Sequence, residues 1–577
     1  MPGSRKISDQ LTGIQARRAL DEARLAGGLK IQPQEKEGEP AAEPTLISHL
    51  RVNREEARLE VRVQGSEEQM TFLARWKLFV LFIKYRNQHH ESNPLEVIKL
   101  LPEKEAMTLH LQLPKYFSKV FYREFFRVYL DARLTILFRW QGAGMTLSGR
   151  LLDLSAGGCQ VAMPFQLALN LVRPLPEWMQ ITLEFPNEEI LRLEAELSYL
   201  KPDETFTQAL VGWHFMPADS EQERKLFHYT LEAERELARL KHPGRSNLHA
   251  SRLFRPAPKK EVKPAGKRLH PAFALVPKSY ASQLQEIADQ LAGQVLLLAA
   301  RKPLDSAHMG KLARQFIHLL EEDTSACLLA LEQPHRNIHR VFLHTFRVAA
   351  RCFPLIFKVG ITRRYELPAM VSLLLHDLGK LFLGHQPCFN PLKEPQPVLR
   401  QLKINQIQLL RSASELRWIP KDLGESLMVN ANERLDGSGY PRGLTATRLD
   451  ALSRLMGVVK VLDCLVHGYN DPVRSWQEAY QWVYKHDHWF DKNSLNTFVT
   501  HHGLRPVGSY LHYKTGKTAL VSRVSDRGQL EEVVLINKQD AEGRILDGRL
   551  LSGGELQALG SPVNEKARLE FNPLKSS

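Results

Sequence analysis

The stretch Leu375-His376-Asp377-Leu378-Gly379-Lys380 closes an apolar run that begins at Leu367, and it decides how the region around it folds. On both sides of it, from about 272 to 504, apolar residues recur with the 3.6-residue period of amphipathic helices. This period predicts an all-helical domain over residues 272–504. A histidine and an aspartate side by side pair an imidazole with a carboxylate, two ligand types that bind divalent metal ions.

A second stretch follows along the chain: Asn432-Glu433-Arg434-Leu435-Asp436-Gly437-Ser438-Gly439-Tyr440-Pro441. Its glycines permit a tight turn and its proline fixes φ, so we expect a loop that holds its shape. Together the two stretches resemble the HD-GYP variant of the HD metal-dependent phosphohydrolase superfamily. The resemblance implies a helical bundle that binds metal ions and hydrolyses cyclic di-GMP. For the glycine-rich loop taken alone, a plain turn remains the alternative.

The resemblance implies a metal site on separate helices, formed by His344, His376, Asp377 and Asp463. Two imidazoles and two carboxylates suit Mn²⁺, Fe²⁺ or a similar divalent ion. One such ion with bound water is enough in principle for phosphodiester hydrolysis. Asp377 is expected to act in catalysis, and Lys380 matches the phosphate-facing lysine of the family. Taken singly, each histidine is equally explained as a packed, hydrogen-bonded residue, and Asp377 as the cap of a turn before Gly379.

Three further histidines of the HD-GYP ligand set are missing from this chain. The corresponding positions are Asn405, Ala431 and Asn432; alanine cannot coordinate, and an amide is a weaker ligand than an imidazole. Arg340, one turn before His344, places a positive charge where some relatives carry an acidic ligand. Two-metal hydrolysis needs both ions about 3.5–4 Å apart. We therefore expect a degenerate HD-GYP domain that holds at most one divalent ion.

Upstream of the helical region, residues 121–240 contain short runs of alternating apolar residues at regular spacing, followed by a charged helical segment. This pattern predicts a small antiparallel barrel with a helix after it. The segment opens with Arg123 and Arg127 and continues to Asp153-Leu154-Ser155-Ala156-Gly157-Gly158. Two arginines four residues apart can offer planar, paired donors to phosphates or to a guanine edge.

These motifs, together with Val211-Gly212-Trp213-His214-Phe215, resemble the PilZ family. Members of that family fold as a six-stranded barrel and bind cyclic di-GMP. The resemblance implies that the ligand is bound by Arg123, Arg127, Asp153, Ser155 and Gly158.

The remaining segments give weaker signals. Residues 1–45 are polar and are expected to form a disordered leader. Alternation in residues 46–120 indicates a small β-containing domain, and residues 505–577 are expected to form a β-hairpin extension and tail. The predicted fold class is therefore α+β multidomain. It comprises a small N-terminal β unit, a six-stranded antiparallel PilZ-like barrel, an all-α HD-type domain and a C-terminal β-hairpin extension.

Positive charge is concentrated in one short segment. Between Lys241 and Pro271 nine lysines and arginines face one acid, Glu261, which is a surplus of eight out of the net +14. Because five prolines interrupt this segment, residues 241–271 are predicted to be a basic linker, and no DNA partner is expected. The five cysteines lie far apart with no C-x-x-C pair, which favours free thiols. With no apolar run long enough to span a membrane, a cytoplasmic location is expected.

The sequence thus predicts a cyclic di-GMP-binding signalling protein, in which a PilZ receptor is coupled to a degenerate HD-GYP domain with weak or no phosphodiesterase activity. Two alternatives stay open: an active cyclic di-GMP phosphodiesterase regulated by the barrel, and a one-metal HD phosphohydrolase that acts on another nucleotide. The number of bound metal ions distinguishes the three. Besides cyclic di-GMP, other signalling proteins that contact the Gly439-Tyr440-Pro441 loop are candidate partners, and a homodimer is left open.

Overall fold

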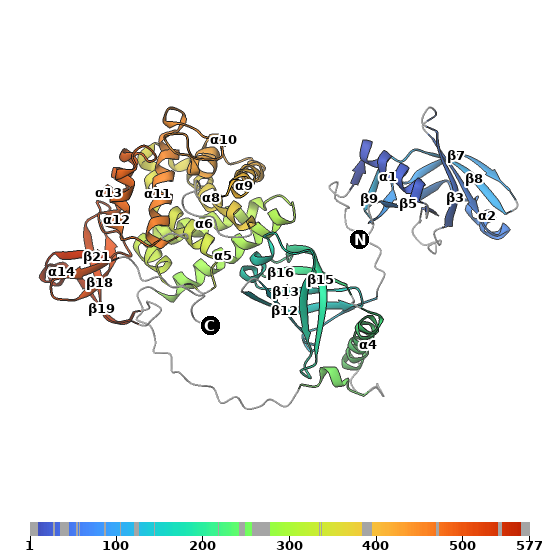
Figure 1. Ribbon diagram of the computed structural model, residues 1–577, viewed down its shortest axis with the longest axis horizontal. Helices are drawn as coiled ribbons and strands as arrows, with labels where there is room; N and C mark the ends of the chain where they lie inside the picture. The colour runs from blue at the N-terminus through green and yellow to red at the C-terminus, as the bar shows by residue number, and fades with distance from the viewer. Residues whose placement is uncertain are drawn as a thin grey trace. The chain divides into compact units, whose positions relative to one another are not determined.

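The chain divides into two compact units, residues 1–126 and residues 127–577 (Figure 1). Within them, a computed structural model describes most of the chain. None of the helices in the part that it describes is both long and apolar enough to cross a membrane. The described residues are 10–26, 29–34, 45–53, 56, 58–85, 88–103, 105–119, 126–142, 145–216, 219–241, 249–256, 277–333, 335, 337–383, 395–468, 472–539 and 545–566.

The N-terminal unit is built on one antiparallel sheet with the strand order β1-β9-β6-β5-β2-β3-β4-β8-β7. Because β5 also pairs with β7, the strands β5-β2-β3-β4-β8-β7 close into a ring. Alternate residues of β4, Leu59, Val61 and Val63, point into its core, as the period-2 pattern predicts. The elements of this unit are β1 (Gln10–Thr12), α1 (Gly13–Ala26), β2 (Lys30–Pro33), β3 (Thr45–Asn53), β4 (Arg58–Gln64), α2 (Glu67–Leu73), β5 (Leu78–Tyr85), β6 (Gln88–Ser92), β7 (Leu95–Pro102), β8 (Ala106–Gln112) and β9 (Tyr116–Lys119).

The disordered leader expected for residues 1–45 is wrong where the structure describes that segment. Helix α1 buries Ala16, Ala19, Leu20 and Ala23 in the core of the N-terminal unit. These residues follow the i, i+3, i+4, i+7 spacing of a single helix face. Strand β2 then lies between β3 and β5 in the sheet. The stripe is short and its residues are small, so the polar composition around it concealed it in the sequence.

The second unit begins with an antiparallel barrel, which confirms the predicted six strands. Strands β12-β11-β14-β15-β16-β13 follow one another, and pairing of β12 with β13 closes the ring, while β10 adds to β12 from outside. Phe138 and Trp213 stack inside it with ring centroids 5.1 Å apart. Its elements are β10 (Arg127–Tyr129), β11 (Leu137–Gly142), β12 (Met145–Ser155), β13 (Gly158–Met163), α3 (Phe165–Ala168), β14 (Met179–Glu184), β15 (Ile190–Pro202), β16 (Ala209–Met216) and the long helix α4 (Ser220–Lys241).

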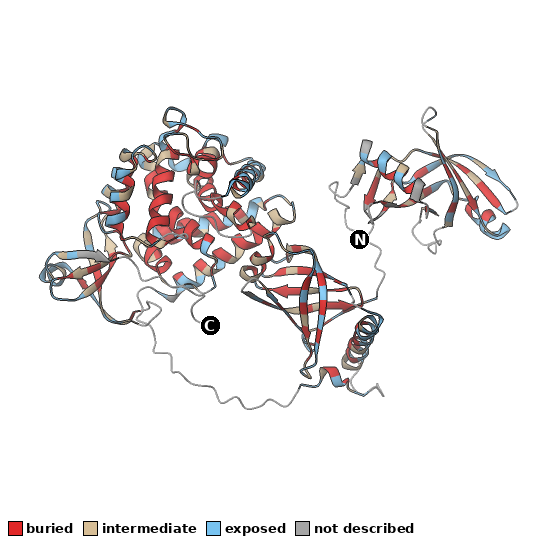
Figure 2. Ribbon diagram, in the orientation of Figure 1, coloured by how far each residue is buried: buried red, intermediate tan, exposed pale blue. Residues whose placement is uncertain are grey.

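An all-helical bundle follows, as predicted. Figure 2 shows that buried residues line the helices in its interior, among them α11, and nearly all residues of α7 are buried as well. The helices are α5 (Lys278–Ala299), α6 (Ser306–Leu331), α7 (Arg340–Ile356), α8 (Glu366–Leu375), α9 (Gln396–Ser414), α10 (Lys421–Gly424), α11 (Ala451–His467), α12 (Trp476–Lys485) and α13 (Lys492–His502), with the short turns η6 (Leu378–Phe382), η8 (Glu425–Val429) and η9 (Asn430–Asn432).

The C-terminal part forms a five-stranded sheet with the order β20-β19-β18-β17-β21. Its first two strands make the predicted hairpin, and the sequence did not reveal the other three. Arg523 on β18 pairs with Asp323, the residue at which α6 departs from helical geometry, at 2.5 Å between Nη2 and Oδ2. The elements are β17 (Tyr510–Tyr513), β18 (Thr518–Val524), β19 (Leu530–Gln539), β20 (Ile545–Ser552), α14 (Gly553–Ala558) and β21 (Pro562–Lys566).

Most of the predicted basic linker, 241–271, lies outside the described residues. Of its described residues, Lys241 is the last residue of α4, and 249–256 contain the short turn η3 (Arg252–Phe254) with Leu253 buried. Ser251 donates its backbone N–H to Glu236 Oε2 of α4 at 2.9 Å. This piece of the segment is therefore packed on the barrel's last helix.

The barrel and the bundle meet within the second unit. The side-chain amide of Gln166, on α3, donates to Asp289 Oδ1 of α5 at 3.1 Å and accepts from the backbone N–H of His339 at 3.0 Å. Phe206, from the β15–β16 turn, stacks on His308 of α6 with ring centroids 4.3 Å apart. His339 is the N-cap of α7, so one barrel side chain contacts two helices of the bundle.

Candidate functional site

The barrel brings four of the five predicted ligand-binding residues, Arg127, Asp153, Ser155 and Gly158, together at its β10–β12–β13 end. Pairing of β10 with β12 places Arg127 opposite Ser155 and Tyr129 opposite Asp153. Arg127 Nη1 donates to Asp153 Oδ2 at 3.1 Å, and the backbone N–H of Gln160 donates to Asp153 Oδ1 at 2.8 Å. The side chain of Arg127 keeps a quarter of its surface exposed, whereas that of Asp153 is buried. The aspartate therefore orients a guanidinium that stays partly exposed, where an anionic ligand can reach it.

The turn between β12 and β13 explains two of the other predicted residues. Ser155 Oγ is buried and donates to the carbonyl of Gly158 at 3.0 Å, which closes the turn. A Cβ at Gly158 would lie 2.3 Å from the carbonyl oxygen of Trp213 on the neighbouring strand. Glycine is thus required by the close approach of β16. Arg123 lies outside the described residues, so its place at this site stays a prediction.

In the bundle, three of the four predicted metal ligands come together. His344 lies on α7, and His376 and Asp377 follow α8 directly; all three are buried. One ligand atom from each lies within 4.8 Å of the other two, a spacing that could hold a metal ion. His344 Nε2 lies 3.3 Å from Asp377 Oδ2. His376 donates Nδ1–H to the carbonyl of Leu373 at 2.6 Å, which leaves Nε2 as the ligand atom of a neutral ring.

Burial and charge fix the protonation states of this cluster. Burial lowers the pKa of His376 to about 3, so the ring is neutral at physiological pH. Burial alone would raise the pKa of Asp377, but the ammonium groups of Lys380 and Lys460 hold it well below its usual range. A neutral imidazole and an ionised carboxylate are the forms that a metal ion binds.

Asp463, the fourth predicted ligand, lies on the other side of His344. Its Oδ2 accepts from His344 Nδ1 at 2.7 Å, while Nε2 of the same ring faces Asp377. Its Oδ1 contacts Arg351 Nη1 at 3.4 Å and His467 Nδ1 at 3.0 Å. In this arrangement Asp463 orients the imidazole as an outer partner and contributes no oxygen to the cluster. Sequence matching could not separate a direct ligand from such a partner.

The residue of α11 that faces the cluster is Lys460, one turn before Asp463, and no sequence motif indicated it. Lys460 Nζ lies 2.5 Å from Asp377 Oδ1 and 2.5 Å from Asn432 Oδ1. Lys380 Nζ lies 2.6 Å from the other oxygen, Asp377 Oδ2. Both oxygens of the cluster's carboxylate are therefore bound by ammonium groups. The donor types suit a divalent ion, but with Lys460 in this position the residues do not fit one.

The two other positions that lack family histidines serve the bundle's structure. Asn405, on α9, donates Nδ2–H to the carbonyl of Gly379 at 3.0 Å and accepts from Gln401 Nε2 at 2.7 Å. Ala431 is buried in the turn η9. Arg340 does not approach the cluster: it donates to the carbonyl of Gly468 at 2.7 Å, just past the end of α11, where a cation is favourable.

The glycine-rich loop is fixed to the bundle from inside. Glu433 accepts the backbone N–H groups of Arg442 and Leu444 at 2.7 and 3.0 Å. A Cβ at Gly439 would lie 2.4 Å from Glu433 Cα, so only glycine fits there. Tyr440 is buried against Leu383 and Leu402, and it is not at the surface where a partner could touch it.

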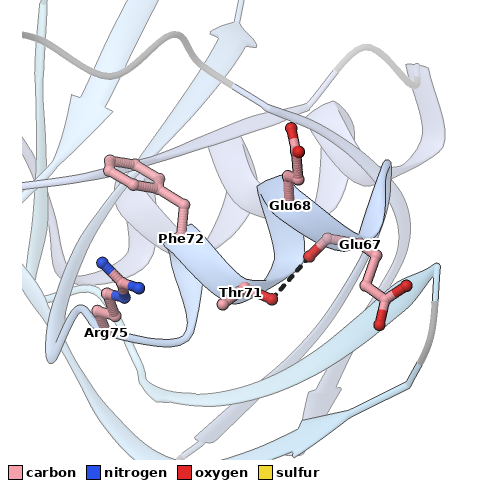
Figure 3. A pocket seen from close by; sticks show the side chains of 5 residues that line it. All are labelled: Glu67, Glu68, Thr71, Phe72 and Arg75. Atoms are coloured by element: carbon pink, nitrogen blue, oxygen red, sulfur yellow. Dashed lines mark hydrogen bonds between the residues drawn. The ribbon is translucent and has the colours of Figure 1, made fainter.

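A surface pocket lies on α2 of the N-terminal unit, lined by Glu67, Glu68, Thr71, Phe72 and Arg75 (Figure 3). The acidic pair lies at the start of the helix and Arg75 beyond its end. The hydroxyl of Thr71 donates to the carbonyl of Glu67 at 2.8 Å, so it bonds to the backbone of its own helix, one turn earlier. The sequence predicted no site residues here, and the pocket does not change the interpretation of the barrel or the bundle.

Two known families match the second unit, one over the barrel and one over the helical bundle. Residues 122–232 match the family described as PilZ domain, and residues 360–493 match the family described as HD domain. The chain therefore contains a PilZ domain followed by an HD domain, which confirms the two resemblances stated above.

Three curated relatives match parts of the chain. A cyclic di-GMP phosphodiesterase of Pseudomonas aeruginosa is 24% identical over 239 residues, which are 39% of this chain and 55% of the relative. A 3'3'-cGAMP-specific phosphodiesterase of Vibrio cholerae is 28% identical over 25% of this chain and 33% of its own length. The response regulator RpfG of Xanthomonas campestris, a cyclic di-GMP phosphodiesterase, is 32% identical over 16% of this chain and 24% of its own length. The chain thus spans about half or less of the relatives that it matches.

Solved structures give similar matches. YcgR from Escherichia coli in complex with c-di-GMP is 15% identical, with 41% of this chain and 98% of that chain covered and a TM-score of 0.19. The protein Bd1817 from Bdellovibrio bacteriovorus is 12% identical, with 59% and 98% covered and a TM-score of 0.31.

Proposed function

We propose that this protein is a cyclic di-GMP receptor, in which the PilZ barrel binds the dinucleotide and passes its occupancy to an HD domain that has lost most or all phosphodiesterase activity. The observation that carries the proposal is the partly exposed guanidinium of Arg127, held by the buried Asp153 at the entrance of the barrel. Cyclic di-GMP presents two phosphates and two guanine edges, both of which suit planar paired donors.

The loss of hydrolysis is supported by the cluster in the bundle. The carboxylate of Asp377 is shared by two ammonium groups, and the positions at 405, 431 and 432 offer no imidazole. Two-metal phosphodiester cleavage needs a pair of bridged ions to stabilise the attacking and leaving oxygens. The described residues of this bundle include one cluster that could hold a metal ion, which supports the loss of such a pair.

Coupling between the halves is supported by Gln166. This barrel side chain accepts the backbone N–H of His339, the N-cap of α7, and α7 carries His344 at the cluster. A shift of α3 on ligand binding would therefore act on the helix that forms one wall of the HD site. A ligand moves such an equilibrium only by the difference in its affinity for the two states.

Calorimetric titration with cyclic di-GMP tests the receptor assignment. We expect Arg127→Ala to weaken binding roughly ten- to hundredfold, because a charge-assisted hydrogen bond contributes about 1.5–3 kcal/mol. Arg139→Ala is the matched control: Arg139 pairs with Glu184 at 3.0 Å on the same barrel, and its loss should leave affinity within about twofold. Wild-type affinity in the Arg127→Ala protein would overturn the proposal.

A second candidate is a metal-dependent phosphodiesterase regulated by the barrel, and the convergence of His344, His376 and Asp377 favours it. A hydrolysis assay separates the two candidates, with cyclic di-GMP and 3'3'-cGAMP as substrates and Mn²⁺ or Fe²⁺ added. The receptor proposal expects no fast, metal-dependent conversion. Rapid conversion that disappears in His376→Ala would establish the enzyme.

A further inference from the structure

We propose that the ammonium group of Lys460 takes the place of a metal ion in the HD centre and keeps divalent ions out. The centre would then be a metal-free form of the site, in which the ammonium group of Lys460 replaces the metal cation. This inference rests on the proposed degenerate HD domain and is independent of nucleotide binding by the barrel.

The position of Nζ carries the proposal. It lies 2.5 Å from Asp377 Oδ1 and 2.5 Å from Asn432 Oδ1, and so bridges the turn after α8 and the turn η9. Asn432 is one of the positions where the family resemblance places a metal-binding histidine. The ammonium group thus connects the carboxylate of Asp377 with Asn432 of the turn η9. A bound metal ion would connect the same two positions. The Lys460 side chain is buried, so its charge must be paired in place.

The neighbouring residues match an ammonium better than a metal. An ammonium donates up to three hydrogen bonds and needs oxygen acceptors; the amide oxygen of Asn432 serves where an imidazole nitrogen would bind a metal. Lys380 binds the remaining oxygen of Asp377 at 2.6 Å. A divalent ion between His344, His376 and Asp377 would meet two ammonium groups at the same carboxylate. Among the described residues of the cluster, only the two imidazoles would then remain to bind the ion, and two ligands are too few for a firm site.

Metal titration of the full-length protein tests the proposal, with binding of Mn²⁺ followed by calorimetry and metal content after dialysis by elemental analysis. Wild-type protein should retain far less than one equivalent of metal, and EDTA should not change its unfolding temperature. Lys460→Met, which keeps the stem and removes the charge, should bind Mn²⁺ at least about tenfold more tightly and be stabilised by it. Lys485→Met, an exposed lysine at the end of α12, is the control and should behave as wild type.

A second substitution locates the gained ion. In the double variant Lys460→Met/His376→Ala the added Mn²⁺ affinity should disappear, since His376 supplies the open Nε2. Lys460→Gln, which keeps a hydrogen-bond donor without charge, replaces Lys460→Met if circular dichroism shows that the latter does not fold. Stoichiometric metal in the wild-type protein that is lost in His376→Ala, or no gain in the folded Lys460 variants, would overturn the inference. Cyclic di-GMP affinity stays unchanged in either case, so the receptor proposal is tested apart from it.

Discussion

Several histidine side chains of the bundle are buried as neutral imidazoles. His502, at the end of α13, is 4% exposed and donates Nε2–H to the carbonyl of Arg351 at 2.9 Å. Burial, aided by the neighbouring His501, lowers the pKa of His502 to about 3. In the unfolded chain the same imidazole titrates near pH 6.5. The unfolded state therefore binds a proton that the folded state does not take up, and the folded state loses stability as the pH falls below 6.5.

His502→Gln should reduce this acid sensitivity. Between pH 7 and pH 5 the wild-type side chain costs about 2 kcal/mol of unfolding free energy, and glutamine, which has no charge to gain, keeps an N–H donor. Urea unfolding at the two pH values, followed by tryptophan fluorescence, measures the difference. The exposed His318→Gln is the control, and it should lose stability between the two pH values as the wild type does. Equal losses in His502→Gln and wild type would contradict the assignment.

Single residues also mark the limit of what the sequence could predict. His344, His376 and Asp377 were expected together, and they lie together. Asp463 and Lys460 are one turn apart on the same helix face, so spacing alone could not choose between them. The motif predicted Asp463 as the residue at the cluster. In the structure, Lys460 contacts Asp377, which lies 83 residues away in sequence. Such pairing depends on packing that no local pattern records.

At the scale of elements, the side chain of Gln166 links the barrel to α7. Gln166 reaches both Asp289 on α5 and the N-cap of α7. Burial raises the pKa of Asp289, and the Gln166 amide moderates this effect. An amide that bonds a half-buried carboxylate and a helix N-terminus at once is costly to remove, because the N-terminus then loses this acceptor and the carboxylate keeps only the donor from Gln285.

Gln166→Ala should abolish the coupling between the barrel and the helical bundle without weakening nucleotide binding. Hydrogen exchange in residues 340–356 is the measurement: cyclic di-GMP should change it in the wild type and leave it unchanged in the variant. Calorimetry should give the same affinity for both, since Gln166 lies outside the Arg127–Asp153 entrance. Gln222→Ala, which removes a hydrogen bond from Gln222 of α4 to the carbonyl of Arg192, is the matched control and should retain the response. A full response in Gln166→Ala would rule out this route.

Elements with a strong periodicity of apolar residues could be predicted from the sequence, and elements with a weak periodicity could not. The barrel strands alternate apolar and polar residues, as in β15, and the bundle helices carry long apolar stripes. Helix α1 offers three alanines and one leucine as its buried face, a stripe too small to stand out from polar surroundings. Strands β19 and β20 follow the predicted hairpin but have mixed burial, because this small sheet is only partly covered.

At the scale of the whole molecule, the described residues of each unit have their own hydrophobic core, and the second unit adds two smaller clusters to its main one. The core of residues 1–126 and the larger core of residues 127–577 share no residue in the described parts. Each unit therefore buries its own apolar surface and is expected to fold by itself.

Removal of residues 1–119 should leave the second unit intact. We expect its unfolding midpoint to stay within about 2 °C of the full-length value and its cyclic di-GMP affinity within about twofold. Differential scanning calorimetry and titration measure the two. A chain that begins at residue 131 is the matched comparison: it lacks Arg123, Arg127 and β10, and should bind the nucleotide far more weakly. A midpoint drop of more than about 4 °C in the first truncation would show that the units depend on each other.

The bridge from Lys460 to Asp377 and Asn432 also bears on the conditions under which the protein can work. A centre that depends on iron or manganese is emptied when a cell is starved of these metals, and ferrous iron is oxidised under peroxide stress. An ammonium encoded in the polypeptide is neither scavenged nor oxidised. A signalling protein built in this way would keep its helical bundle assembled through metal limitation, and its response would follow the second messenger alone.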